Sequence, residues 1–307
     1  MLTFTIANRD HCRRVESFLR TLMPAAPSGY ARKLIKSGAA KLNGATAIPD
    51  TLLCLHDTVI LKESGATTGY ISTVRPALDI LYEDARIVIV NKPPGLPMHR
   101  TAECEDNLVD AGQASMIDRG TPCKLYPVNR LDRGTSGAVI LAKSSSSAGI
   151  YGRQVKETGL DKLYLALARG TPDDSGIITA PLDDKESETR YRIMLTGDRG
   201  SLLAVTPISG RMHQIRRHLS MIGHPVVGDK RYGGGDMPGY PGFALHSFRT
   251  ALVLDEAGVL TVCAPVADDM LTLCEASGIG RDTLFEAVYR LAQTPEEKIQ
   301  ADREEAS

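Results

Sequence analysis

Asp132 lies between Arg130 and Arg133 in the stretch NRLDRGTSGAVILAK, residues 129–143. A carboxylate flanked by guanidinium groups is either a solvated surface charge or a catalytic base or nucleophile. Residues 138–142 are a continuous apolar run that is typical of a buried strand, so the loop carrying Asp132 leads into the core. The triplet alone leaves both interpretations open, and the rest of the chain has to decide between them.

A second stretch, GRMHQIRRHLSMIGHPVVGDKRYG at 210–233, is strongly cationic. An apolar stripe at helical spacing predicts a helix that ends at Gly223, and its members are Met212, Ile215, Leu219 and Ile222. The other faces carry Arg211, His213, Gln214, Arg216, Arg217 and His218. The two histidines are five residues apart, which is the wrong spacing for two ligands on one helical face, so no metal site is predicted.

The composition is that of an ordinary soluble protein of 307 residues, with 24% charged and 42% hydrophobic residues. This length predicts two domains, or one domain with a smaller companion. No run approaches the roughly 18 apolar residues of a membrane helix, and no signal-peptide core is found near the start. The six cysteines are scattered without CxxC spacing, which indicates free thiols in a reducing cytoplasm.

The net charge of −1 hides an uneven distribution. Residues 1–62 contain nine Lys or Arg and four Asp or Glu, whereas residues 266–307 contain four Lys or Arg and ten Asp or Glu. A cationic field at the N-terminus is the footprint expected of phosphate binding, although a solvated basic face on a small domain explains it equally well.

Patterning divides the chain into five parts. A basic module over residues 1–62 precedes a Gly-, Ser- and Thr-rich linker at 63–75, and a larger domain follows at 76–278. An amphipathic helix is predicted for 279–292, and the charged tail at 293–307 is expected to be disordered.

Two short helices, a hairpin and a strand are predicted within the module. The second helix, in YARKLIKSG, carries Arg32, Lys33 and Lys36, and the first and last of these share one face. In the larger domain, runs such as IVIV (87–90) and the alternating KLYLALARG (162–170) predict many short strands joined by brief turns. The expected fold class is therefore α+β, with a mixed, mainly antiparallel sheet beside a small α/β module.

The stretch SGYARKLIKSGAAKLNGATAIPDTLLCLHDTVIL resembles the S4 RNA-binding domain, and the likeness extends over about residues 12–62. The shared wording is a Leu-Ile-Lys-x-Gly helix end, an Asn-Gly turn and an aspartate before the last strand. Two positions depart from it, because Gly29 stands in place of the usual arginine and His56 in place of the usual glycine. The resemblance implies RNA binding by the basic helix, and docking against another protein surface is the alternative.

NRLDRGTSGAVILAK together with SGRMHQIRRHLSMIGHPVVGDKRYG resembles the RluA-type pseudouridine synthases. The family wording is Arg-Leu-Asp-x-x-Thr-Ser-Gly, an apolar strand and Ala-Lys, followed by Gly-Arg-x-His-Gln-Ile-Arg-x-His, Pro-x-x-Gly-Asp and Tyr-Gly. Supporting stretches, among them VNKPPGLPMH, KLYLALARG and ALHSFRTALVL, extend the likeness over about residues 78–277. One departure is visible, because Asn129 stands where a histidine usually precedes Arg-Leu-Asp. The resemblance implies the pseudouridine synthase fold for the larger domain.

The same resemblance implies that the chain isomerises uridine to pseudouridine in RNA, which breaks the C1′–N1 bond, turns the uracil and joins C5 to C1′. Asp132 matches the essential aspartate, which either attacks the sugar or removes a sugar proton, and the sequence does not distinguish these roles. Arg216 matches the arginine that pairs with it, since a guanidinium favours an ionised carboxylate and orients it. Tyr164 matches the active-site tyrosine, which is expected to stack on uracil and to act at C5, directly or through water.

The uridine has to leave its stack to reach such a pocket, which costs roughly a few kcal/mol. Contacts between basic side chains and phosphates offset that cost. The residues expected to contact RNA are Arg130, Arg133, Arg211, His213 and Arg217 in the larger domain, and Arg32, Lys33 and Lys36 in the module. A solvated surface position is the alternative for each of them.

No cofactor and no metal are expected, because the isomerisation needs neither a redox partner nor a group donor. The expected partner is RNA, above all large-subunit ribosomal RNA, on which most S4-bearing members of the family act. Neither a membrane nor a nucleotide cofactor is expected as a partner. The expected location is cytoplasmic, and a monomer is favoured, although the sequence leaves the oligomeric state open.

Three other functions stay open. The substrate of the same chemistry could be transfer RNA. The chain could also be an RNA-binding or ribosome-assembly factor whose catalysis has decayed, as the departures at Gly29 and Asn129 suggest. A glycoside hydrolase would need a second carboxylate about 5–9 Å from the first, and the spacing nominates none of Asp183, Asp184 and Asp229.

Overall fold

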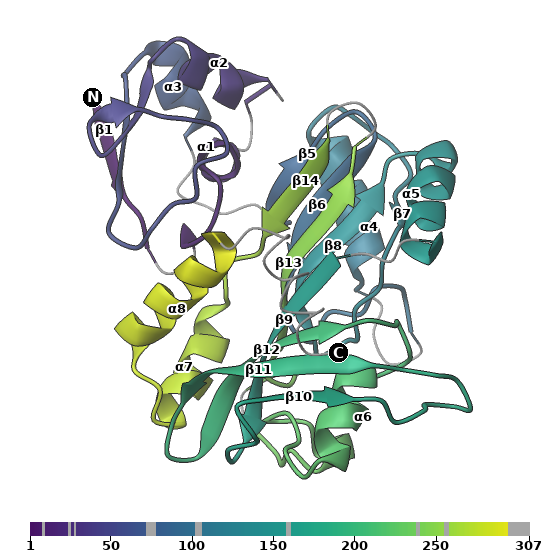
Figure 1. Ribbon diagram of the computed structural model, residues 1–307. Coiled ribbons are helices and arrows are strands. Elements are labelled where there is room, and N and C mark those ends of the chain that lie inside the picture. Colours follow the sequence, from purple (N-terminus) through teal and green to yellow (C-terminus); the bar gives the residue numbers. More distant parts are fainter. Residues whose placement is uncertain are drawn as a thin grey trace.

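The structure is a computed structural model that describes residues 1–7, 10–23, 26–27, 29–71, 78–101, 106–157, 161–237, 240–254 and 258–293. Two sheets organise the molecule (Figure 1). The smaller sheet belongs to the N-terminal part, residues 2–71, and the larger one to the body, residues 78–293. No helix in the described residues has both the length and the hydrophobicity to cross a membrane.

The N-terminal part is a four-stranded antiparallel sheet with short helices. Its elements are β1 (Leu2–Thr5), α1 (Val15–Leu22), α2 (Tyr30–Lys36), β2 (Ala40–Leu42), β3 (Ala45–Thr46), β4 (Thr58–Leu61) and α3 (Gly65–Tyr70). The strand order is β1-β4-β2-β3. Asn43 and Gly44 both have positive φ, as the two-residue turn of the β2–β3 hairpin requires. The structure thus contains the two helices, the hairpin and the strand that the sequence predicts here.

Part of the segment expected to be a linker, residues 63–75, is helical. Ser64 caps α3, because its Oγ accepts a hydrogen bond from the backbone N–H of Thr67 at 3.1 Å. The ring of Tyr70 packs edge-on against Tyr30, with 5.1 Å between the ring centroids. Six residues without apolar periodicity carry no helical signal, so composition alone indicates a linker. The rest of the expected linker, from residue 72, lies outside the described residues.

The body is built on a mixed sheet of ten strands, counted over the described residues. The strands are β5 (Ile80–Glu83), β6 (Ile87–Lys92), β7 (Tyr126–Pro127), β8 (Ser136–Ala142), β9 (Asp161–Arg169), β10 (Ser175–Ile178), β11 (Thr189–Thr196), β12 (Gly200–Pro207), β13 (Leu245–Val253) and β14 (Val259–Cys263). The order is β10-β11-β12-β9-β13-β8-β6-β5, while β14 pairs with β13 and β7 with β8. Only β13 and β8 form a parallel pair among these strands, so the sheet is mainly antiparallel, as predicted.

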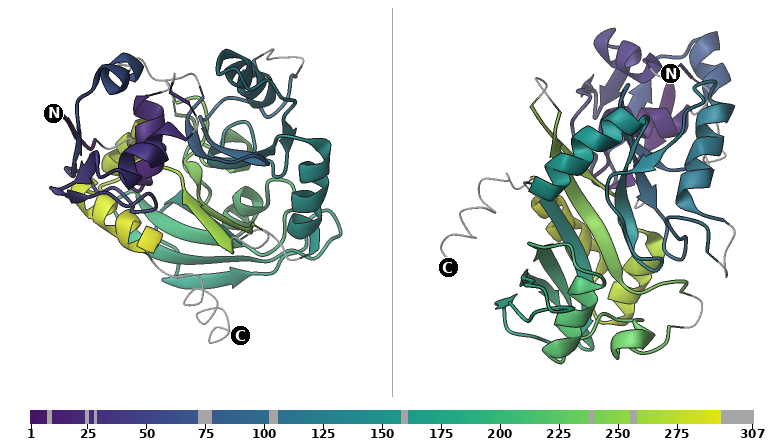
Figure 2. Two further views of the ribbon diagram at one scale, coloured as in Figure 1. Left: turned by 90° about the horizontal axis from the view of Figure 1, so that it is seen from above. Right: turned by 90° about the vertical axis from the view of Figure 1, so that its right-hand side faces the viewer.

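Helices lie on both flanks of this sheet. They are α4 (Leu108–Asp118), α5 (Ser145–Glu157), α6 (Gln214–Met221), α7 (Asp268–Ala276) and α8 (Arg281–Gln293). Figures 1 and 2 show α8 beside the N-terminal part and α5 at the opposite flank of the body. A helix was expected at 279–292, where α8 buries Leu284, Phe285, Val288 and Leu291. Beyond Gln293, the predicted tail lies outside the described residues.

The loop that carries Asp132 enters β8 through Gly137, whose φ is +108°. A Cβ at this position would lie 2.3 Å from the carbonyl oxygen of Ser247, because β8 and β13 run side by side there. Glycine is therefore needed both for the backbone conformation and for the close approach. This requirement explains the glycine of the Thr-Ser-Gly sequence. The absence of a side chain there lets the start of β8 lie directly against β13.

His246 on β13 is fully buried beside the same junction. Its Nε2–H donates to the carbonyl oxygen of Ala264 at 3.0 Å, so Nδ1 is left to accept a hydrogen bond from the hydroxyl of Ser136 at 2.9 Å. Burial lowers the pKa of His246 to about 4, although the hydrogen bond to Ala264 acts in the opposite direction. A neutral imidazole therefore joins β8 and β13 to the segment after β14.

This imidazole predicts acid lability. The pKa of His246 is lower in the folded than in the unfolded protein, so its contribution to stability is complete above about pH 6.5 and is lost as the pH falls toward 4. From pH 7.5 to pH 5 we expect the group to account for a loss of about 2 kcal/mol in the free energy of unfolding. Urea denaturation of the wild type and of His246→Gln at both pH values measures it. An equally steep pH dependence in the variant would contradict the assignment.

The N-terminal part is fastened to the body by α1 and the residues before it. Arg13 is fully buried and donates two hydrogen bonds, of 2.8 and 2.7 Å, to the carboxylate of Asp79 just before β5. The hydroxyl of Ser17 on α1 donates to the carbonyl oxygen of Ile80 at 3.0 Å. Buried charge pairing and hydrogen bonds to β5 therefore fix α1 against the larger sheet.

His11 makes a second attachment, to α8. Its Nδ1 accepts a hydrogen bond from the backbone N–H of Leu55 at 3.1 Å, so its Nε2–H donates to the carbonyl oxygen of Phe285 at 2.8 Å. The ring of Phe285 packs edge-on against the imidazole, with 4.8 Å between the centroids. Burial lowers the pKa of His11. The neutral ring thus connects the N-terminal sheet to the last described helix.

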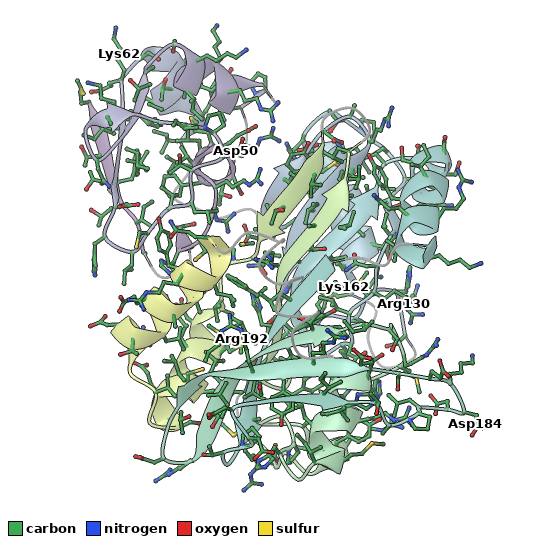
Figure 3. All side chains as sticks on the ribbon, in the orientation of Figure 1. Asp50, Lys62, Arg130, Lys162, Asp184 and Arg192 are labelled. Atoms are coloured by element: carbon green, nitrogen blue, oxygen red, sulfur yellow. The ribbon has the colours of Figure 1, made fainter. Side chains whose placement is uncertain are left out.

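Loss of the Asp79 carboxylate should loosen this attachment. Asp79→Asn leaves the buried guanidinium of Arg13 with the carboxylate of Asp10 at 3.2 Å, and we expect the free energy of unfolding to fall by about 2–4 kcal/mol. Asp50→Asn is the matched control, because Asp50 pairs with Arg14 at 2.6 Å but its side chain is 70% exposed (Figure 3). The control should cost less than about 1 kcal/mol. Calorimetry that gives the two variants equal stability would refute the attachment.

Candidate active site

Asp132 lies in an open cleft of the body, on the loop that leads into β8. The cleft has a volume of about 1100 Å³, and loops after β6, before β8, around α6 and before β13 form it. Seven Lys or Arg and two His line it, against three Asp, counted over the described residues. The cleft is therefore cationic around Asp132, whose side chain is 28% exposed.

Arg216 on α6 pairs with Asp132. Its Nη1 donates to Oδ2 of Asp132 at 2.8 Å, and its Nε and Nη2 donate to the two oxygens of Asp229 at 2.6 and 3.0 Å. The guanidinium carbon lies 4.0 Å from the ring centroid of Phe243 and 5.0 Å from that of Tyr232. Burial acts to lower the pKa of Arg216, but the hydrogen bonds to Asp229 and Asp132 outweigh it and raise the pKa. The guanidinium is therefore a fixed cation.

Asp229 is 1% exposed and holds Arg216 from behind. It follows Gly228, whose φ is +82°, and its carbonyl oxygen accepts a hydrogen bond from the N–H of Gly234 at 2.8 Å. A Cβ on Gly234 would lie 1.8 Å from the carbonyl oxygen of Val226, so the loop leaves no room for a side chain there. Sequence reasoning considers Asp229 only as a possible second carboxylate of a glycoside hydrolase and misses its contact with Arg216. The signal that could have indicated this contact is the Gly-Asp pair ahead of a glycine-rich stretch.

Helix α6 begins at Gln214, two residues later than the apolar pattern predicts. His213 has φ +54° and ψ +27°, a left-handed conformation that interrupts the predicted helix. Met212 therefore precedes the helix and is 61% exposed, while Ile215 and Leu219 form the buried stripe. The side chain of Gln214 stabilises this turn, because its Oε1 accepts a hydrogen bond from the backbone N–H three residues earlier at 3.0 Å.

The imidazole of His213 approaches Asp132. Its Nε2 lies 3.8 Å from Oδ1 of Asp132, and its Nδ1 lies 2.9 Å from the hydroxyl of Tyr232. Burial lowers the pKa of His213, the negative charge of Asp132 opposes this shift, and the positive charges of Arg216 and Arg231 add to it. The ring is therefore neutral near neutral pH.

Lys92, at the end of β6, is fully buried and ties together the loops around Asp132. Its Nζ donates to the carbonyl oxygens of Pro93, Leu96 and Arg133 at 2.9, 2.8 and 3.1 Å. Burial lowers the pKa of Lys92 to about 7, against the opposing attraction of Asp132. From the sequence, Lys92 is only a residue at the end of a buried strand, and its bridging contacts depend on the tertiary structure.

Tyr164 on β9 is 7% exposed, and it is not among the described residues that line the cleft. The strand register places it opposite Ser247 on β13. Burial raises the pKa of Tyr164 to about 12, Ser247 opposes this shift, and the negative charge of Asp132 adds to it. The phenol therefore stays protonated near neutral pH. Its catalytic assignment stays a prediction.

Only some of the residues predicted to contact RNA line the cleft. Four line the cleft: Arg130, Arg133, Arg211 and His213. Arg217 instead pairs with Asp183 at 2.9 Å and is not among the described lining residues. On α2, Arg32 pairs with Glu16 at 2.9 Å, and two lysines are exposed, Lys33 and Lys36. Figure 3 shows Arg130 between α5 and α6 in that view, far from Lys62 of the N-terminal part.

Of the three departures from the family wordings, the structure explains the one at Asn129. Asn129 is buried, and its Oδ1 accepts a hydrogen bond from the backbone N–H of Ile140 at 2.8 Å, so it braces β8. His56 has φ +69°, the left-handed conformation to which glycine is best suited. Gly29 precedes α2, and no atom lies within 4 Å of a Cβ built there, so there is space for a side chain.

The three carboxylates weighed for a glycoside hydrolase are either outside the described cleft lining or bound by Arg216. Asp183 and Asp184 are exposed on the loop between β10 and β11, and Figure 3 shows Asp184 at its outer end. Both oxygens of Asp229 are occupied by Arg216. In the described part of the chain, no three His, Cys, Asp or Glu side chains are grouped so that they could hold a metal ion.

Comparisons with known proteins point to one family. Residues 86–221, which include Asp132, Tyr164 and Arg216, match the family described as RNA pseudouridylate synthase. The ribosomal large subunit pseudouridine synthase C of Salmonella typhimurium is 30% identical over 253 residues, which cover 74% of this chain and 78% of that protein.

Two solved human structures share the fold. The chain called human RNA pseudouridylate synthase domain containing 1 aligns with a TM-score of 0.53 and 25% identity, covering 72% of this chain and 96% of that one. For human RNA pseudouridylate synthase domain containing 4, the TM-score is 0.56 at 21% identity, covering 64% and 91%. With the matching fold, the matching motifs and a relative of this identity, the chain belongs to the RluA-type RNA pseudouridine synthases, which are isomerases.

Proposed function

We propose that the protein isomerises specific uridines to pseudouridine in large-subunit ribosomal RNA. The observation that carries the proposal is the ion pair between Asp132 and Arg216 in a cationic cleft. A cleft of this sign attracts a polyanion, and the guanidinium orients the carboxylate for chemistry on the bound nucleoside. The ribosomal substrate is supported by the name of the Salmonella relative, a ribosomal large subunit pseudouridine synthase.

The two carboxylate oxygens of Asp132 are proposed to have different roles. Arg216 holds Oδ2 at 2.8 Å, which leaves Oδ1 for the substrate. Oδ1 either attacks C1′ of the ribose or removes a sugar proton, and in both cases the C1′–N1 bond breaks and the uracil is released within the site. The uracil turns and C5 bonds to C1′, which releases Oδ1 from C1′ in the first case and is accompanied by return of the proton to the sugar in the second. C5 then loses its proton and N1 gains one, so that product and substrate are isomers.

Tyr164 is proposed to act on the uracil. Its aromatic ring would stack on the extruded base. Because the phenol is protonated near neutral pH, it would also donate a hydrogen bond, while the proton on C5 leaves through water. Arg130, Arg133 and Arg211 line the cleft, and we propose that they hold the phosphates that flank the extruded uridine.

The N-terminal part is proposed to be an S4-like RNA-binding module. The resemblance of residues 12–62 supports this, together with the exposed Lys33 and Lys36 on α2. The guanidinium of Arg32 is tied to Glu16, so phosphate contacts from α2 depend mainly on the two lysines. Since α1 is fixed to the body, the module and the cleft would engage one RNA as a single rigid surface.

Pseudouridine mapping tests the proposed function. Total RNA from a strain that lacks the gene is incubated with the purified protein, and pseudouridines are mapped before and after. New pseudouridines at discrete positions of large-subunit ribosomal RNA are the expected result. Modification of transfer RNA alone would show that the protein is a pseudouridine synthase but that ribosomal RNA is not its substrate. Binding without any modification would instead support a decayed RNA-binding factor.

A further inference from the structure

The cleft contains a second polar atom aimed at the reactive oxygen of Asp132. Nε2 of His213 lies 3.8 Å from Oδ1, the oxygen that Arg216 leaves for the substrate. A direct hydrogen bond between nitrogen and oxygen spans about 2.7–3.2 Å, so these two atoms are too far apart to bond to each other. They are the right distance apart to share one hydroxyl group, each at about 2.8 Å from its oxygen.

His213 is held rigidly in this position. Its backbone is left-handed, with φ +54°, and this conformation places the residue at the entrance of α6. Its Nδ1 lies 2.9 Å from the hydroxyl of Tyr232, and the two rings meet edge-on with 5.7 Å between their centroids. Tyr232 is fixed in turn, because its carbonyl oxygen accepts a hydrogen bond from Ser220 at 2.7 Å and Arg216 lies over its ring.

The two neighbours of the imidazole determine what Nε2 can do. Because Nε2 faces the carboxylate of Asp132, which can only accept, the neutral imidazole carries its hydrogen on Nε2, and Nδ1 accepts a hydrogen bond from the phenol hydroxyl of Tyr232. A group bound between Nε2 and Oδ1 must therefore accept from the imidazole and donate to the carboxylate. A hydroxyl does both, whereas a carbonyl oxygen can only accept and an ammonium group can only donate.

We propose that Nε2 of His213 and Oδ1 of Asp132 together bind the 2′-hydroxyl of the target ribose. This inference rests on the proposed function, which brings C1′ of the uridine to Oδ1. The 2′-hydroxyl is on the carbon next to C1′, so binding it there places both C1′ and C2′ within reach of the same oxygen. Because only RNA carries this group, His213 also makes the site selective for a ribonucleotide.

Two substitutions separate this role from a structural one. Asparagine tolerates the left-handed backbone, and His213→Asn keeps an amide near the Nδ1 position but does not reach Oδ1. Glutamine is one methylene longer, so His213→Gln brings an amide N–H to about the position of Nε2. The control is His224→Ala, since His224 bonds to the carbonyl oxygen of Arg169 at 2.9 Å and is not among the described cleft residues.

The probes are two RNA oligonucleotides that carry the mapped target either as uridine or as 2′-deoxyuridine. Dissociation constants are measured by fluorescence anisotropy, and turnover of the uridine probe is followed with the same proteins. We expect the wild type and His224→Ala to bind the uridine probe about tenfold more tightly than the deoxyuridine probe, as for one good hydrogen bond. His213→Asn should reduce this ratio to about threefold or less, and His213→Gln should restore most of it.

The outcomes distinguish this inference from the proposed function. A wild type without a preference for uridine overturns the inference, as does a His213→Asn variant that keeps the full ratio or weakens both probes equally. If the wild type converts the uridine probe in that case, the proposed function stands and the role of His213 alone is refuted. If the wild type converts no probe, the proposed function fails whatever the binding ratios are.

Discussion

Replacing Asp132 by alanine should reduce the rate of pseudouridine formation by about 10³-fold or more, in the range expected when a nucleophile or a catalytic base is removed. The protein should still fold, because the Asp132 side chain is 28% exposed and Arg216 keeps both of its hydrogen bonds to Asp229. RNA binding should persist, since the cationic lining of the cleft is unchanged. Single-turnover assays on the mapped RNA, with binding measured in parallel, give both quantities.

Asp184→Ala is the matched control for this experiment. Its carboxylate is exposed at the outer end of the loop between β10 and β11, away from the cleft lining, so its removal should leave the rate within about twofold. An Asp132→Ala variant that retains a tenth or more of the wild-type rate would show that another group carries the chemistry. Loss of activity together with loss of folding would be resolved with Asp132→Asn, which keeps the shape of the side chain.

Replacing Asp229 by asparagine should produce the largest loss of stability among the substitutions considered. The change removes the charge that balances a buried guanidinium, because Asp229 is 1% exposed and accepts hydrogen bonds from Nε and Nη2 of Arg216. Breaking one side of a buried ion pair costs about 3–5 kcal/mol. For a domain of this size the midpoint of thermal unfolding should fall by about 10 °C. Calorimetry measures the change.

The control is a carboxylate of the same region of the chain. Asp236 pairs with Lys230 at 2.7 Å, but both side chains are more than half exposed, so Asp236→Asn should cost less than about 1 kcal/mol. Asp229→Asn should also slow the reaction, because Arg216 would no longer hold Oδ2 of Asp132 in one orientation. An Asp229→Asn protein with unchanged thermal stability would mean that Arg216 does not need its buried partner.

Features marked by a local sequence pattern or by a family motif could be predicted. Apolar runs identify the strands that flank the site, so the mixed, mainly antiparallel sheet is confirmed. The pairing of Asp132 with Arg216 follows from the family resemblance, and the structure brings the two side chains to 2.8 Å. The family itself is confirmed by the comparisons.

Features that depend on contacts across the fold could not be predicted. Lys92 and Asp229 support the site through bonds to other loops. Both lie in stretches that match the family wording, but neither stretch indicates which groups its residue contacts. The apolar stripe over α6 predicts an earlier start, since a spacing rule does not register the left-handed backbone of His213. Arg217 has the same residue type and sequence neighbourhood as Arg216, yet it faces an exposed aspartate instead of the cleft.

The attachment of α1 to β5 has a consequence for any shortened form of the enzyme. β5 is the last strand of the large sheet, and the side chains of Arg13 and Ser17 occupy the carbonyl oxygen of Ile80 on that strand. Without residues 1–71, this edge of β5 would be exposed to solvent. Exposed edge strands pair with strands of other molecules through their free backbone groups. We therefore expect the N-terminal part to keep this edge from pairing with other molecules, and a catalytic fragment without it to aggregate unless the edge is covered in another way.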